Sequence, residues 1–209
     1  MGTSGVFRTA AQAATALSLA LVLSSCGSPA PGPSGSTSPS PSPSPSVSTT
    51  TPVPEPTPTL PGAATTPVSR PPGDDGFGLL TSVRLAGHPG YDRFVLEFRD
   101  AVPGYQVSYI SGSPTADPSG DLVEVEGSAV LWIRLEPSSG WDLVGAPDEP
   151  TYTGPDRVTG DTVRVTEAVR TGDFEAVLSW VLGVDGEAPF VVTELSGPPR
   201  LVVDVATAG

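Results

Sequence analysis

The stretch Gly197-Pro198-Pro199-Arg200-Leu201-Val202-Val203-Asp204-Val205, close to the C-terminus, decides the fold of this chain. Its β-branched run predicts a strand, in which Leu201, Val203 and Val205 point to one face and the intervening residues point to the other. The two prolines before this run carry no N–H for a ladder, so they lie just outside the sheet. The chain therefore closes with a strand.

Similar strand-like runs recur from about Phe77 to Ala206, with Gly, Pro and Asp between them. Two hairpin turns are expected, at Gly172-Asp173 and at Asp185-Gly186. We find no convincing amphipathic helix, so the fold class predicted is all-β, a β-sandwich of about eight to nine short strands. The expected strands before the closing one are 80–85, 93–98, 105–110, 122–126, 129–135, 162–169, 174–182 and 190–195.

Residues 1–25 are predicted to be a lipoprotein signal peptide. Arg8 is followed by an apolar run that is too short for a comfortable membrane span of about 20 residues. The run ends in Leu23-Ser24-Ser25-Cys26, which resembles a bacterial lipobox and implies that Cys26 is lipidated. Cys26 is the only cysteine, so it has no disulfide partner within the chain. A lipid with two or more acyl chains anchors stably, so we expect a membrane protein that faces the extracytoplasmic side.

Residues 26–76 follow as a linker that is rich in Pro, Ser and Thr. Its centre is the repeat Ser38-Pro39-Ser40-Pro41-Ser42-Pro43-Ser44-Pro45. The linker contains almost no large apolar residues, so burial cannot offset the entropy lost on ordering it. We therefore expect a disordered, semi-extended polyproline II spacer. Residues 77–209 are then a single domain with one hydrophobic core.

The charge of the chain excludes one class of partner. The formal net charge is −13, and no lysine is present. An acidic domain does not bind nucleic acid through bulk electrostatics, and anionic wall polymers repel it. A wall ligand would therefore be held by local hydrogen bonds and by stacking.

The residues needed for enzyme chemistry are scarce. His88 is the single histidine, and the sequence Gly-His-Pro-Gly around it is typical of a turn. No Gly-x-Ser-x-Gly motif is present, and one histidine does not make a zinc site. A glycosidase needs a pair of carboxylates, and acidic residues are numerous in this chain. An acidic surface accounts for that abundance. We predict no enzyme, no cofactor and no metal.

Arginines and one tryptophan are the candidate ligand-binding residues: Arg84, Arg93, Trp132, Arg134 and Arg200. Each arginine falls opposite the apolar positions of its strand. They form either a polar face that recognises carboxylates or sugars, or cross-strand pairs with acidic neighbours. Trp132 is either an exposed stacking platform or is covered by the long loop 137–160, which carries Trp141. That loop is either functional or poorly ordered. Trp180 is expected in the core.

Three stretches of the domain together resemble the AMIN-like domain of actinobacterial secreted proteins and lipoproteins. They are Gly87-His88-Pro89-Gly90-Tyr91-Asp92-Arg93-Phe94-Val95-Leu96-Glu97-Phe98, then Gly172-Asp173-Phe174-Glu175-Ala176-Val177-Leu178-Ser179, and the closing strand with its prolines. The resemblance implies a β-sandwich that localises proteins in the cell envelope and binds peptidoglycan without catalysis. The alternative is a module that docks an envelope enzyme or complex.

Overall fold

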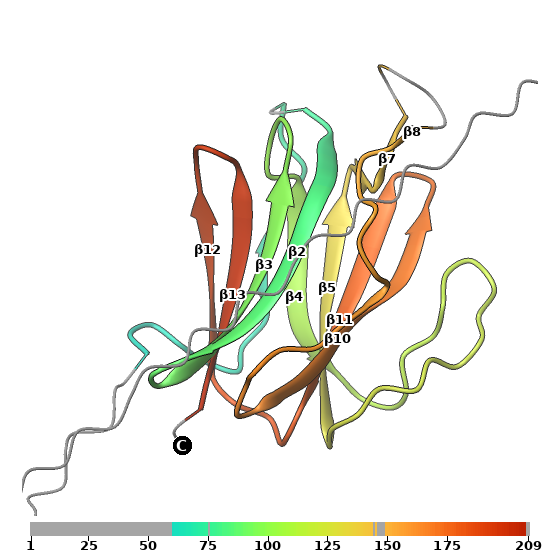
Figure 1. The fold of residues 1–209 in the computed structure, drawn as a ribbon. Coiled ribbons are helices and arrows are strands. Elements are labelled where there is room, and N and C mark those ends of the chain that lie inside the picture. The colour runs from blue at the N-terminus through green and yellow to red at the C-terminus, as the bar shows by residue number, and fades with distance from the viewer. Residues whose placement is uncertain (1–59, 75, 144, 146–148, 208–209) are drawn as a thin grey trace, which may run out of the picture. The chain divides into compact units, whose positions relative to one another are not determined.

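The computed structural model of the chain describes residues 60–74, 76–143, 145 and 149–207 (Figure 1). The predicted signal peptide, Cys26 and most of the predicted linker lie outside these residues. The described part consists of strands and loops, so the all-β fold class is confirmed. No helix in this part is long and apolar enough to cross a membrane.

The described residues form thirteen strands, and eight of these contain six residues or more. The long strands are β2 (Gly78–His88), β3 (Tyr91–Phe98), β4 (Gly104–Ile110), β5 (Ala129–Glu136), β10 (Val165–Phe174), β11 (Val177–Val184), β12 (Phe190–Leu195) and β13 (Arg200–Ala206). The short strands are β1 (Val68–Arg70), β6 (Ser138–Ser139), β7 (Trp141–Asp142), β8 (Glu149–Pro150) and β9 (Arg157–Val158).

The closing strand β13 lies inside a five-stranded sheet of order β12-β13-β3-β2-β6. It pairs antiparallel with β12 and with β3, so both of its edges are hydrogen-bonded. Leu201, Val203 and Val205 are fully buried on its inner face, as the alternation predicted. The two prolines precede the strand, which confirms their place outside the sheet.

A six-stranded sheet of order β1-β4-β5-β11-β10-β9 forms the second layer, and all of its pairs are antiparallel. Strand β5 alternates strictly. Leu131, Ile133 and Leu135 are fully buried, whereas Trp132 and Arg134 between them are half-buried. The last two side chains therefore belong to the outer face of this sheet.

The hydrophobic core lies between the inner faces of the two sheets. Trp180 of β11 is fully buried there, as expected, and its ring packs against Phe94 of the opposite sheet with 5.9 Å between centroids. The same buried cluster contains residues of β2, β3, β12 and β13 from one layer and of β4, β5, β10 and β11 from the other. This arrangement is the predicted β-sandwich.

Both predicted hairpin turns need correction. The turn between β10 and β11 is Glu175-Ala176, whose φ angles of 48° and 62° are both positive, as in a type I′ turn. Gly172-Asp173 instead lies within β10. At Asp185-Gly186 the chain does turn, with φ +79° at the glycine. However, this turn joins β11 of one sheet to β12 of the other and makes no hairpin.

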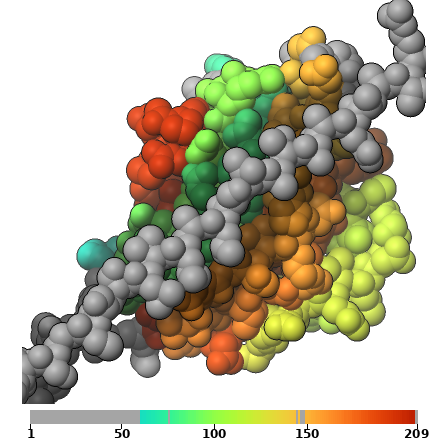
Figure 2. Space-filling view, in the orientation of Figure 1, coloured from blue at the N-terminus to red at the C-terminus, as the bar shows by residue number. Residues whose placement is uncertain are grey.

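The expected strand 122–126 is also wrong. Within this stretch only Leu122 makes a β-bridge, to Thr115, and its side chain is 74% exposed. The stretch belongs to a long connection, residues 111–128, between β4 and β5, which we call the arm. Figure 2 shows the arm as a yellow-green ridge at one side of the domain. The alternation of Val and Glu suggested a strand, but these residues do not join either sheet.

The fold begins earlier than the predicted linker boundary at residue 76. Strand β1 pairs with β4 at the edge of the six-stranded sheet. Ala64 exchanges two backbone hydrogen bonds with Phe190 of the five-stranded sheet, at 3.1 and 2.9 Å. The Arg70 guanidinium donates to the carbonyls of Val102 and Pro103 and pairs with Glu194 at 3.1 Å. Residues 60–74 therefore bind the edges of both layers.

Candidate functional site

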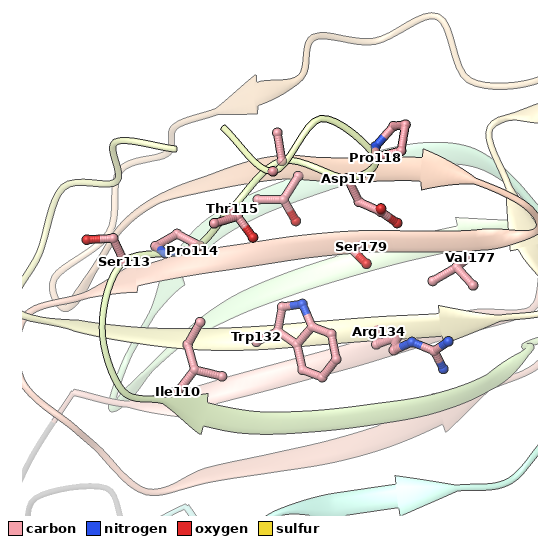
Figure 3. A pocket seen from close by; sticks show the side chains of 13 residues that line it. Ile110, Ser113, Pro114, Thr115, Asp117, Pro118, Trp132, Arg134, Val177 and Ser179 are labelled. Carbon is pink, nitrogen blue, oxygen red and sulfur yellow. The ribbon is translucent and has the colours of Figure 1, made fainter. Parts of the chain in front are cut away.

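A groove of about 490 Å³ lies on the outer face of the six-stranded sheet, between the sheet and the arm (Figure 3). Trp132 and Arg134 of β5 line its floor, and the register places Ser179 of β11 directly beside Arg134. Residues 113–118 of the arm form the opposite wall. The groove therefore contains two of the five residues proposed from the sequence as ligand-binding.

Backbone hydrogen bonds hold the arm over the sheet. The Asp117 N–H donates to the Thr171 carbonyl of β10 at 2.7 Å, and Asp117 forms a parallel bridge with Gly172. A Cβ on Gly172 would stand 2.9 Å from the Asp117 Cβ, so glycine is required for this close approach. Further along the arm, the Glu126 N–H donates to the carboxylate of Glu167 at 2.8 Å. The wall of the groove is thus fastened to the sheet that forms its floor.

The groove combines an aromatic ring with polar groups of both charges. Arg134 pairs with Glu136, two residues along the same strand, and more than a third of its side chain is exposed. Asp117 is exposed on the arm. Ile110 and Val177 supply apolar surface. An accessible indole with hydrogen-bonding groups around it is suited to a ligand that has one apolar face and a polar rim.

The other three candidate arginines lie on the opposite side of the sandwich, on the outer face of the five-stranded sheet. Arg93 binds Asp204 with two hydrogen bonds, of 2.7 and 2.8 Å, which raise the pKa of the guanidinium. Arg84 pairs with Glu97 at 2.8 Å. Arg200 donates to the Pro198 carbonyl at 3.3 Å.

These contacts bear on the alternatives that the sequence left open for Arg84 and Arg93. The cross-strand ion pairs that were one alternative are confirmed for Arg84 and Arg93. The five candidates do not share one face, because Trp132 and Arg134 belong to one sheet and the remaining arginines to the other. Alternation along single strands gives the side of each residue but not the sheet that contains it.

The described residues of the loop that carries Trp141 do not line the groove at Trp132. The lining residues come from β4, β5, β10, β11 and the arm. The described part of the Trp141 loop instead closes one edge of the core, where the ring of Tyr152 packs edge-on against Trp180 at 6.0 Å. Trp141 itself is 43% exposed. Trp132 is half-buried, so it is neither the fully exposed platform that was one alternative nor in contact with the described part of this loop at the groove.

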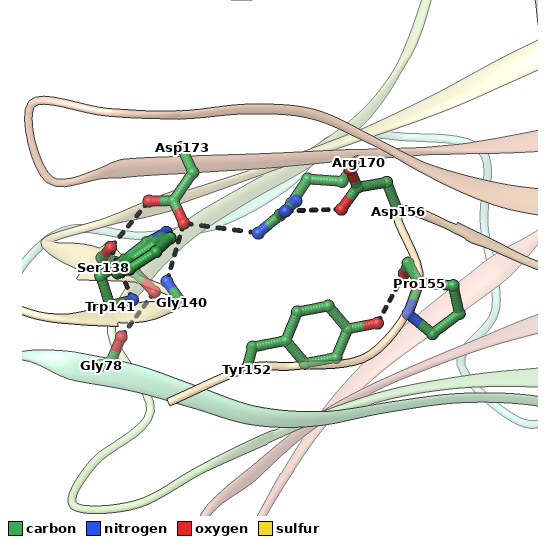
Figure 4. A network of polar contacts seen from close by, with 10 residues as sticks. Gly78, Ser138, Gly140, Trp141, Tyr152, Pro155, Asp156, Arg170 and Asp173 are labelled. Carbon is green, nitrogen blue, oxygen red and sulfur yellow. Dashed lines mark hydrogen bonds and ion pairs between the residues drawn. The ribbon is translucent and has the colours of Figure 1, made fainter. Parts of the chain in front are cut away.

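Figure 4 shows the polar network that orders this loop. Asp173 of β10 accepts hydrogen bonds from the Ser139 hydroxyl at 2.8 Å and from the Gly140 N–H at 2.9 Å. Arg170 lies over the Tyr152 ring and pairs with Asp156 at 2.5 Å. Each charged group in the network has a partner within it, so these residues stabilise the fold and are not a candidate site.

Asp92 has a structural role that the sequence did not indicate. Its carboxylate is fully buried and accepts hydrogen bonds from three successive backbone N–H groups, those of Val163, Arg164 and Val165, at 2.6 to 3.1 Å. These bonds hold residues 162–164 in a loop, so β10 begins at Val165 and not at 162 as predicted. Nothing in the sequence pattern distinguished Asp92 from the acidic neighbours that were expected to pair with arginines.

His88 lies away from the groove. It is exposed beside a turn, and its ring stacks on Tyr91 with centroids 5.0 Å apart. Across the described ranges, no three His, Cys, Asp or Glu side chains gather closely enough to hold a metal ion.

Sequence reasoning missed the arm's share of the groove, namely Thr115, Asp117 and the contact with Thr171. Gly172 permits this close approach of the arm backbone, but it was predicted as part of a hairpin turn, so the sequence did not indicate the contact.

Searches of curated proteins and of solved structures found no match to this chain. The family model of the AMIN-like domain matches residues 78–207, which include every long strand of both sheets. The chain therefore belongs to the AMIN-like domain family.

Proposed function

We propose that this protein is a lipid-anchored protein of the cell envelope whose AMIN-like domain binds peptidoglycan. AMIN-like domains are in general non-catalytic modules related to the cell wall. Cys26, after the predicted signal peptide, would carry the lipid, and the Pro/Ser/Thr-rich stretch would let the domain reach the wall. The domain itself would hold its ligand without changing it.

The accessible indole of Trp132 carries the proposal. It lies in a groove large enough for a sugar ring, next to Arg134 and Ser179. Sugar rings present apolar C–H faces that pack on aromatic rings, while their hydroxyl groups need hydrogen-bonding partners at the rim. The groove offers both, and it does so on a protein whose net charge of −13 disfavours purely anionic polymers.

A second candidate function is docking of an envelope protein. Trp141 and Leu143 are 43% and 50% exposed, two residues apart and away from the groove. Exposed tryptophan is enriched at protein interfaces, so this pair would be the contact if the domain recruits an enzyme.

Co-sedimentation of the full chain, purified in detergent, with purified peptidoglycan sacculi tests the proposal. We expect binding that persists at high salt, since stacking is not screened. Trp132→Ala should lose binding, whereas the matched control Trp141→Ala should keep it. If the unmodified chain stays in the supernatant, wall binding is wrong. If Trp141→Ala loses binding and Trp132→Ala keeps it, the contact lies at Trp141 and Leu143.

The lipid anchor needs its own experiment in cells. Cys26→Ala should release the protein from the membrane fraction, and a mass increase on the N-terminal peptide of the unmodified protein should disappear. A Cys26→Ala protein that stays in the membrane fraction would contradict the anchor.

A further inference from the structure

The groove has opposite charges on its floor, where Arg134 lies, and on its wall, where Asp117 lies. Asp117 stands on the arm, where it is bridged to Gly172 of β10. Gly172 pairs with Ser179, and Ser179 pairs with Arg134. Two strand spacings separate Gly172 from Arg134, which is roughly 10 Å along the sheet. The backbone positions of the carboxylate and the guanidinium thus lie on either side of Ser179, and both residues line the same groove.

Both charged groups have capacity for a ligand. The Arg134 guanidinium contacts Glu136 through one terminal nitrogen, and within the described residues this is its only ion pair. The Asp117 carboxylate makes no hydrogen bond or ion pair to the other described residues, although its backbone is firmly held. This differs from the other sheet, where Arg93 is fully engaged by Asp204.

Groups that suit a compact, partly apolar ligand lie between these charges. The Ser179 hydroxyl lies beside Arg134, and the Trp132 ring opens onto the same space (Figure 3). A neutral sugar would use the ring and hydroxyl groups but neither charge. A polyanion would meet Asp117 and the net charge of −13, both unfavourable. A ligand with one positive and one negative group would pair with both Asp117 on the arm and Arg134 on the floor.

We propose that the groove recognises the peptide stem of peptidoglycan together with its sugar, as a zwitterionic ligand. A carboxylate of the stem pairs with Arg134, the free amine of the stem pairs with Asp117, and the sugar packs on Trp132. This inference rests on the proposed wall binding and narrows it to the peptide-bearing part of the polymer. It predicts that glycan stripped of peptide is a poor ligand.

Three soluble probes separate the contributions of the amine, the peptide and the sugar to binding. The first is a disaccharide-peptide with a free amine, released from sacculi by muramidase. The second is the same compound after N-acetylation of that amine, and the third is the disaccharide without peptide. Titration with the full chain is followed by intrinsic fluorescence in a Trp141→Phe background, because Trp180 is fully buried and Trp132 then dominates the response.

We expect the disaccharide-peptide to bind most tightly and N-acetylation to weaken it on the order of fivefold, as for an exposed ion pair. Arg134→Gln and Asp117→Asn should each weaken binding by a similar factor. In Asp117→Asn, acetylation should cause no further loss, because the two changes remove the same pair. The control Arg84→Gln, on the outer face of the other sheet, should bind as the unmodified chain does.

The outcomes distinguish two hypotheses, recognition of a zwitterionic ligand and binding to the cell wall in general. If the chain binds sacculi but binds the peptide-free disaccharide as tightly as the disaccharide-peptide, the zwitterionic ligand is wrong and wall binding stands. The zwitterionic ligand is also wrong if acetylation weakens binding to the unmodified chain and to Asp117→Asn equally. If the chain binds neither sacculi nor any probe, wall binding itself is wrong.

Discussion

Asp92→Ala should destabilise the domain strongly, although the residue is far from the proposed groove. Its buried carboxylate accepts hydrogen bonds from the N–H groups of Val163, Arg164 and Val165. Alanine would leave these three donors without their acceptor. The loop that precedes β10 would then lose the contact that ties it to β3 of the opposite sheet.

The magnitude follows from the exposure of the three donors. Val165 is 1% exposed, so its N–H cannot reach water and costs about 1–3 kcal/mol when unpaired. Val163 is 76% exposed and Arg164 is half-buried, so water replaces part of their bonds, at about 0.5–1 kcal/mol each. The total is about 2–5 kcal/mol. For a domain of this size the melting temperature should fall by roughly 6–18 °C.

Urea unfolding followed by tryptophan fluorescence measures this loss, because Trp180 lies in the core. Asp161→Ala, an exposed carboxylate in the same loop, is the matched control and should change stability by less than about 0.5 kcal/mol. Asp92→Asn keeps one acceptor oxygen, so its loss of stability should lie between those of Asp92→Ala and Asp161→Ala. A loss below about 1 kcal/mol for Asp92→Ala would refute the reasoning, since it would mean that the buried Val165 N–H finds another acceptor.

The remaining predictions concern alkaline stability, the arm and the N-terminal segment. Burial raises the pKa of Tyr109 above its ordinary value of 10.0, so Tyr109 ionises first in the unfolded chain, and the free energy of unfolding should fall as pH rises above 10.0. In urea titrations at several pH values, Tyr109→Phe should make this fall less steep. An unchanged dependence of the free energy of unfolding on pH would contradict the prediction. Gly172→Ala should push Asp117 away and speed hydrogen exchange at the Asp117 amide, whereas unchanged exchange would mean that the arm tolerates the added methyl. Arg70→Ala should cost about 1–3 kcal/mol in the same unfolding assay, because the Val102 and Pro103 carbonyls lose a charged donor. Equal stability would show that the Arg70 side chain adds nothing to the attachment of residues 60–74.

The long strands of this fold can be read from alternation in the sequence. The apolar faces of β3 and β5 follow a strict period of two. On β13 the predicted inward residues Leu201, Val203 and Val205 are buried, although Val202 and Asp204 between them are buried as well. Strand ends are harder to place, because they depend on contacts distant in the sequence. β10 begins at Val165 because of Asp92, some seventy residues earlier, and Glu175-Ala176 form a type I′ turn without the usual Asn-Gly.

The candidate site could be predicted only in part for the same reason. Trp132 and Arg134 were found because they lie on the polar side of a clear strand. Asp117 could not be found, since its place depends on how the arm folds back onto β10. Whether two arginines share a face depends on the assignment of strands to sheets, and a single sequence without long-range contacts does not provide it.

The attachment of residues 60–74 to both sheets also bears on how this domain would respond to mechanical force. A pull on the chain before Leu60 first reaches Ala64, which is bonded to Phe190 of one sheet, and then β1, which is paired along β4 of the other. Hydrogen bonds of an antiparallel pair stand perpendicular to the strands, so tension along β1 loads them together and not one after another. If the domain is tethered at this end and holds a rigid polymer on its outer face, both layers of the sandwich would bear the tension.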